Sequence, residues 1–147
     1  MIWKIKTFDQ LTGEEVYKLL KLRSEVFVVE QNCVYLDPDG KDQHSYHLYL
    51  EDEGEIVACT RLLNKGVAYK QASIGRVIVK KDYRGKGLSR ELLLKSISFI
   101  EENMKETEIK IQAQAYLFDF YGSFGFNAIS EEYLEDGIPH IDMLYKK

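Results

Sequence analysis

Hydrophobic and polar residues alternate with two different periods along the chain, and the change of period separates predicted strands from predicted helices. Residues 3–8 (WKIKTF) alternate with the period of two that is typical of a strand with one buried face. Thr12 and Glu15 follow at the spacing of a capping box, in which each side chain satisfies a free backbone amide. Apolar residues then recur at helical spacing, which predicts a helix to about Val28 that packs on a sheet: Val16, Leu19, Leu20, Val26 and Phe27.

The stretch after this helix predicts a loop followed by a hairpin. Residues 33–45 (CVYLDPDGKDQHS) contain a proline and a glycine among polar residues, which indicates an exposed loop. Its aspartates do not form an EF-hand, because Gly40 is the fourth residue counted from Asp37, whereas a calcium loop needs glycine at its sixth position. Residues 46–63 (YHLYLEDEGEIVACTRLL) predict two strands joined around residues 53–54.

The second half of the chain predicts a strand, a long helix and another strand. Residues 72–83 (ASIGRVIVKKDY) and 108–116 (EIKIQAQAY) have strand patterns. On a helical wheel that starts at Leu88, these apolar residues share one half: Leu92, Leu93, Ile97, Phe99 and Ile100. A strand, helix and strand in this order favour parallel pairing with a right-handed crossover. The pattern therefore predicts a mixed sheet in an α/β or α+β fold.

Length and composition indicate a single domain that covers residues 1–147. The chain has 147 residues and a mass of 17.1 kDa, with 45% hydrophobic and 30% charged residues, as in ordinary globular domains. No repeat, low-complexity tract or linker divides it. A net charge of −4 and a pI near 5.5 argue against a nucleic-acid partner, because such domains carry a basic face.

Several other classes of site are excluded by the sequence pattern. No apolar run approaches the ~18 residues that span a bilayer, and the N-terminus lacks a signal-peptide pattern, so we expect a cytoplasmic protein without a membrane partner. Cys33 and Cys59 form neither a CxxC motif nor a disulfide framework. His44 and His47 would lie on opposite faces of a strand, and no third ligand is evident, so we expect no metal.

Residues 82–93 (DYRGKGLSRELL) carry the strongest chemical signal, at the junction between a predicted strand and the long helix. The first amides of a helix have no intrahelical acceptor, and the helix dipole adds a partial positive charge of ~0.5 at this end. Gly85 and Gly87 permit positive φ and remove the Cβ atoms that would keep a phosphate away from those amides. Cationic side chains add formal charge there: Arg84, Lys86 and Arg90. The junction therefore predicts a socket for a pyrophosphate.

The alternative is that the two glycines only form a tight turn and that the cations face solvent. The sequence matches neither the P-loop pattern nor G-x-G-x-x-G, so a domain that binds ATP or a dinucleotide is disfavoured. A phosphate-containing ligand of another class must be considered.

The residues RGKGLS at 84–89 resemble the Arg/Gln-x-x-Gly-x-Gly/Ala motif of the GNAT superfamily of acyl-CoA-dependent N-acyltransferases. Ser89 departs from the motif, since glycine or alanine is usual there, but its side chain is also small. Three further segments resemble the ElaA-type branch, and together they cover most of the chain: LRSEVFVVEQNCVYLDPDGKD (22–42), AQAYLFDFYGSFGF (113–126) and YLEDGIPHIDM (133–143).

The resemblance implies a GNAT fold, with a mixed twisted sheet of about six to seven strands flanked by helices. It also implies that acetyl-CoA is the cosubstrate. Free backbone groups of a splayed strand would bind its pantetheine arm, at Val77, Ile78 and Val79. Backbone amides of the following turn would bind its pyrophosphate, at Arg84, Gly85, Lys86, Gly87, Leu88 and Ser89.

Tyr121 matches the family tyrosine that protonates the departing thiolate of CoA, although a core aromatic residue is the alternative. A phenol with a pKa of about 10 can donate that proton. The general base is open among three candidates: Glu30, His47 and His140. Each has a structural alternative, as a solvated carboxylate or a hydrogen-bonded histidine. Cys33 is not required as a nucleophile, because direct transfer needs no thioester on the protein.

The resemblance implies transfer of an acetyl group to a primary amine by direct attack in a ternary complex. The acceptor would be a small molecule or a peptide amine, and the acidic residues at 37–42 and 130–136 favour a cationic one, unless they only form a solvated face. The alternative function is an acyl-CoA-binding sensor or interaction module without turnover. The sequence does not fix the oligomeric state, and a homodimer is compatible with it.

Overall fold

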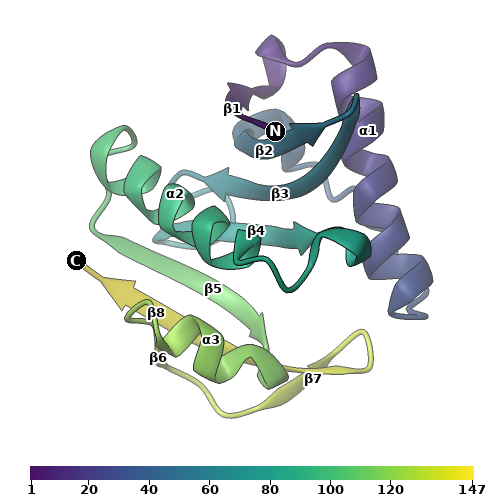
Figure 1. Cartoon of the computed structure of the whole chain (residues 1–147). Coiled ribbons are helices and arrows are strands. Elements are labelled where there is room, and N and C mark those ends of the chain that lie inside the picture. The colour runs from purple at the N-terminus through teal and green to yellow at the C-terminus, as the bar shows by residue number, and fades with distance from the viewer.

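The computed structural model describes all residues 1–147, and eight strands form one mixed sheet in the order β1-β2-β3-β4-β5-β8-β6, with β7 paired to β8 (Figure 1). The strands are β1 (Ile2–Thr7), β2 (Ser45–Asp52), β3 (Glu55–Leu63), β4 (Ala72–Val79), β5 (Glu108–Gln114), β6 (Asn127–Ala128), β7 (Tyr133–Glu135) and β8 (Ile138–Lys146). The helices are α1 (Gly13–Arg23), a π-helical continuation of it (Ser24–Glu30), α2 (Leu88–Glu102) and α3 (Phe118–Gly122). Short 3₁₀ turns occupy residues 8–10, 42–44, 81–83 and 115–117.

Strand pairing is antiparallel throughout except between β4 and β5. The parallel pairing confirms the prediction from the strand, helix and strand pattern. The sheet has one or two strands more than the six to seven that the resemblance implies, and it includes two very short strands, β6 and β7, of two and three residues.

The first helix begins as predicted. Thr12 Oγ1 accepts a hydrogen bond from the Glu15 amide at 3.1 Å, and Glu15 Oε1 accepts one from the Thr12 amide at 2.9 Å. The helical backbone runs two residues past the predicted end at Val28, and the last stretch, up to Glu30, is π-helical.

Helices cover both faces of the sheet. Tyr49 of β2 packs with Leu19 and Leu22 of α1, whereas its neighbours on β2 pack with α2. Because successive residues of a strand point to opposite faces, α1 and α2 lie on opposite sides of the sheet. Tyr121 of α3 shares a buried cluster with α2 residues, which places α3 on the α2 side. No helix is both long enough and apolar enough to cross a membrane.

The structure agrees with the predicted hairpin turn and differs from the expectation for His44. The hairpin turn lies where predicted, and its two residues have positive φ, 49° at Glu53 and 77° at Gly54. His44 was expected on a strand, but it lies in the 3₁₀ turn at 42–44, so the opposite-face argument for His44 and His47 does not apply.

Candidate functional site

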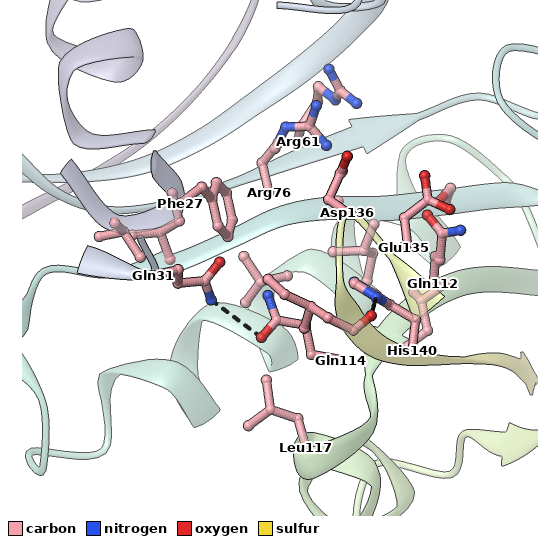
Figure 2. A pocket seen from close by; sticks show the side chains of 18 of the residues that line it. Phe27, Gln31, Arg61, Arg76, Gln112, Gln114, Leu117, Glu135, Asp136 and His140 are labelled. Carbon is pink, nitrogen blue, oxygen red and sulfur yellow. Dashed lines mark hydrogen bonds between the residues drawn. The ribbon is translucent and has the colours of Figure 1, made fainter. Parts of the chain in front are cut away.

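Strands β4 and β5 separate soon after they meet, and a cavity opens between them. Only two residues of β4, Ala72 and Ser73, pair with β5, and beyond them the two strands diverge (Figure 1). The cavity has a volume of about 860 Å³. Residues from β4, β5, the π-helical end of α1, the loop at 33–41, the β7–β8 hairpin, α2 and α3 line it (Figure 2).

The predicted pantetheine-binding residues lie on the open edge of β4. Val77, Ile78 and Val79 all line the cavity, and none of them has a partner on β5. Their side chains also pack into the core, since Ile78 and Val79 are only 2% and 7% exposed. Backbone groups on the β5 side of this edge therefore have no strand partner and can bind a ligand, apart from the Val79 carbonyl, which accepts a hydrogen bond from Arg84 Nε.

The turn before α2 has the geometry of an anion socket. Gly85 and Gly87 both have φ of 79°, in the left-handed region that favours glycine. Helix α2 begins at Leu88 without a side-chain cap. The backbone hydrogen bonds include none donated by the amides of residues 85–90, while the Glu91 amide donates to the Gly87 carbonyl. Six consecutive amides are therefore free, which suits the pyrophosphate of a CoA molecule.

The residues of this turn contact the cavity unequally. Arg84 and Ser89 line it, whereas Gly85, Lys86, Gly87 and Leu88 lie outside its lining. Leu88 is 9% exposed and belongs to the core on the α2 side. The Lys86 ammonium lies 5.5 Å from the centroid of the Tyr83 ring. The socket therefore adjoins the cavity at its rim.

Glu30, one of the three base candidates, is paired with a residue of the predicted socket. Its carboxylate accepts hydrogen bonds from Arg84 Nη1 at 2.6 Å and Nη2 at 3.0 Å. These hydrogen bonds lower the pKa of Glu30, which weakens it as a base. Arg84 Nε also donates to the Val79 carbonyl at 2.8 Å, so the side chain is fixed to the open strand.

Tyr121 lines the cavity and is buried in an aromatic cluster at the same time. Its side chain is 6% exposed, and its ring packs edge-on against Phe120 and Phe126. Burial raises the pKa of Tyr121, so the phenol stays protonated at neutral pH. The two interpretations of Tyr121 from the sequence, a core aromatic residue and a proton donor, are therefore compatible. A residue in the core can also present a protonated hydroxyl to the cavity.

His140 lies in the cavity wall at the β7–β8 hairpin (Figure 2). Its Nδ1 is 2.7 Å from the Ile138 carbonyl oxygen. A carbonyl can only accept, so Nδ1 must carry a hydrogen, and in the neutral ring Nε2 then has the free lone pair. The ring stacks against Tyr133 at 6.3 Å between centroids.

His47 is not brought to the cavity. It is 3% exposed, and its Nε2 lies 2.9 Å from the Asp42 carbonyl oxygen. Burial lowers the pKa of His47. The structure therefore brings Glu30, His140 and Tyr121 to the cavity and leaves His47 buried outside its lining.

The sequence did not predict an ionic network that joins the loop at 33–45 to arginines of the neighbouring elements. Three aspartates expected to attract a cationic acceptor are instead ion-paired with arginines. The pairs are Arg23 with Asp37 and Asp42, Arg61 with Asp39 and Asp42, and Arg76 with Asp37 and Asp39. Glu135 and Asp136 belong to the other acidic segment; both line the cavity and form no ion pair within the protein.

Comparison with known proteins agrees with this geometry. A family model for the acetyltransferase (GNAT) domain matches residues 9–147. Protein ElaA of Escherichia coli strain K12 is 39% identical over 143 residues, which cover 96% of this chain and 94% of ElaA. The crystal structure of E. coli ElaA has a TM-score of 0.92 at 38% identity and covers 99% of this chain and 100% of that one. An acyl-CoA N-acyltransferase from Pseudomonas aeruginosa has a TM-score of 0.93 at 39% identity, with 99% of both chains covered. The chain therefore belongs to the GNAT acetyltransferase family, with ElaA among its relatives.

Proposed function

We propose that the protein transfers an acetyl group from acetyl-CoA to a primary amine by direct attack in a ternary complex. The observation that carries this proposal is the arrangement of three features around one cavity. These are the open edge of β4, the six free amides at residues 85–90, and the buried, protonated Tyr121.

The free amides and Arg84 suit the pyrophosphate, and the edge at residues 77–79 suits the pantetheine arm. A bound acetyl-CoA supplies a thioester, whose carbonyl carbon accepts the amine nitrogen. The new C–N bond forms as the C–S bond breaks, and the sulfur takes up a proton. Tyr121 is the donor in this proposal, because its phenol is protonated and lines the cavity. Much of the rate would come from holding the two reactants together.

The carboxylates of Glu135 and Asp136 support a cationic acceptor. They lie at the tip of the β7–β8 hairpin, on the same side of the cavity as His140 (Figure 2). Unpaired carboxylates raise the local concentration of ammonium groups by electrostatic attraction. Small-molecule amines and peptide amines both meet this requirement.

His140→Gln should lower turnover at least about tenfold, because the acceptor ammonium must lose a proton before its nitrogen can attack. We propose His140 Nε2 as the group that takes this proton. The expected loss is smaller than for an irreplaceable base, since water can take over part of the transfer. Steady-state kinetics with a saturating amine measures the effect, and His44→Gln is the control, because His44 is exposed and lies outside the cavity lining. Equal turnover of the two variants would remove His140 as the base.

Glu30→Gln should tighten CoA binding by about two- to threefold, because Arg84 is then free to meet the pyrophosphate. The effect is small, since both partners are more than a third exposed, at 39% for Arg84 and 36% for Glu30. Calorimetry with CoA measures it, with Glu14→Gln as a control that breaks an exposed pair with Lys18. Weaker CoA binding would instead show that Glu30 contributes to the CoA site. Turnover as low as that of His140→Gln would indicate that Glu30 acts as a base.

The function itself is tested by measuring CoA thiol release with a panel of amines. The proposal expects amine-dependent release and a matching acetylated product by mass spectrometry. A protein that binds acetyl-CoA without any such release would be a sensor. Competition by ATP or NAD for the same site would indicate a nucleotide-binding domain.

A further inference from the structure

Strand β4 contains a bulge at the cavity wall. The register places Cys59 opposite Ile78 but Arg61 opposite Gly75, so β4 has one residue more than β3 in this interval. Arg76 lies within the interval and has φ of 51°, in the left-handed region. Glycine adopts this conformation at little cost, whereas arginine does so under strain. A side-chain interaction of the arginine can offset this strain.

The side chain of Arg76 is held by a buried aspartate. Its Nε lies 2.8 Å from Asp37 Oδ1, and its Nη2 donates to the Asp37 carbonyl at 2.9 Å. Asp37 is 4% exposed and is fixed from the other side, because Arg23 Nε donates to its Oδ2 at 2.6 Å. The Tyr35 hydroxyl donates to its Oδ1 at 2.5 Å. The anchor of Arg76 is therefore rigid.

The main chain of Arg76 has a second contact. Cys59 Sγ lies 3.7 Å from the Arg76 carbonyl oxygen, at hydrogen-bond distance for a thiol. Burial raises the pKa of Cys59 to about 12, so the thiol remains protonated and can donate. The bulge is thus contacted through both the side chain and the carbonyl of one residue.

The bulge comes directly before the open edge at residues 77–79. In Figure 2 the Arg76 side chain extends from β4 toward Arg61, away from Gln114 and His140. Its guanidinium contacts Asp37 on that side, although Arg76 also belongs to the lining of the cavity.

We propose that Arg76 is a positioning residue, whose ion pair with Asp37 holds the β4 bulge and so aligns the open strand edge for acyl transfer. The inference rests on the proposed acyltransferase function. The ionic network would then have a structural role, because it joins the loop at 33–45 to β4, the strand that lines the cavity.

Arg76→Gly tests this with little risk to folding. Glycine tolerates φ of 51°, and Asp37 keeps Arg23 as its partner, so no buried charge is left alone. Turnover should fall about tenfold, and the dissociation constant of acetyl-CoA should rise by a smaller factor, about two- to threefold, because the strand edge at 77–79 loses its brace while the amides at 85–90 are untouched. Amides of residues 74–79 should exchange with deuterium at least about threefold faster, because the strand is no longer braced.

Glu53→Gly is the matched control, since Glu53 also has positive φ, 49°, but lies in the β2–β3 turn outside the cavity lining. Its kinetics and the exchange of residues 74–79 should match the unmodified protein. Two results for Arg76→Gly would overturn the inference. One is unchanged deuterium exchange of residues 74–79, and the other is a loss of acetyl-CoA affinity as large as the loss of turnover. Rescue of turnover by added guanidinium would also overturn it, because a free ion cannot brace the backbone. The exchange measurement needs no turnover, so it tests the brace even if the protein proves to be a sensor.

Discussion

Tyr121→Phe should lower turnover by about 100-fold or more, while the dissociation constant of acetyl-CoA changes by less than about twofold. The substitution removes only the hydroxyl, and the phenyl ring keeps the edge-on contacts with Phe120 and Phe126. Without the hydroxyl, the thiolate leaves as an unprotonated anion in a site where burial disfavours charge. The loss should therefore fall on the chemical step.

The pH dependence of the unmodified protein follows from the same residue. Burial raises the pKa of Tyr121, so the phenol keeps its proton above the ordinary pKa of about 10. Turnover should not decline below that pH through loss of this proton. Stopped-flow measurement of thiol release between neutral pH and the pH limit of folding checks the expectation.

Tyr116→Phe is the control for Tyr121→Phe. Tyr116 lines the same cavity, but its side chain is 76% exposed. The substitution therefore removes a hydroxyl that solvent can replace. We expect nearly unchanged kinetics. If Tyr121→Phe retained turnover within about threefold of the Tyr116→Phe value, another group or water would be the proton donor.

Local patterns predicted most of the fold correctly. The capping box at Thr12 and Glu15, the hairpin turn at residues 53–54 and the crossover from β4 to β5 all follow from residues close together in the chain. Such features depend on short-range hydrogen bonds and on hydrophobic period, which a single sequence displays directly. The glycine turn before α2 belongs to the same class.

The ionic network could not be predicted in this way. Its members are distant in sequence: Arg23 and Asp37 are 14 residues apart, and Arg76 and Asp37 are 39 apart. A charged residue at an isolated position looks solvated unless its partner is known. The bulge at Arg76 was missed because its signal in residues 72–79 is one isolated glycine, Gly75, which does not by itself fix where the register shifts. His47 was misplaced as a candidate because its distance from the cavity depends on how β2 pairs within the sheet.

Gly87→Val should raise the dissociation constant of CoA by about 100-fold or more. Valine at φ of 79° is strained, and its Cβ branches would stand where a phosphate must approach the amides of the turn. Hydrogen bonds to a charged group contribute about 1.5–3 kcal/mol each, so losing two of the six available amides accounts for such a factor. Calorimetric titration with CoA measures it.

Two controls separate the backbone strain of Gly87→Val from its loss of phosphate contact. One is the same substitution at a second glycine, and the other is a shorter ligand. Gly54 has φ of 77° and, like Gly87, no atom within 4 Å of an added Cβ, but it lies in the β2–β3 turn away from the cavity. Gly54→Val should therefore lower the melting temperature about as much as Gly87→Val and leave CoA affinity unchanged. Acetylpantetheine contains the thioester and the pantetheine arm without the pyrophosphate, so Gly87→Val should not weaken its binding. If Gly87→Val weakened acetylpantetheine as much as CoA, the substitution would act through the β4 edge, and the free amides at 85–90 would lose their role as the phosphate socket.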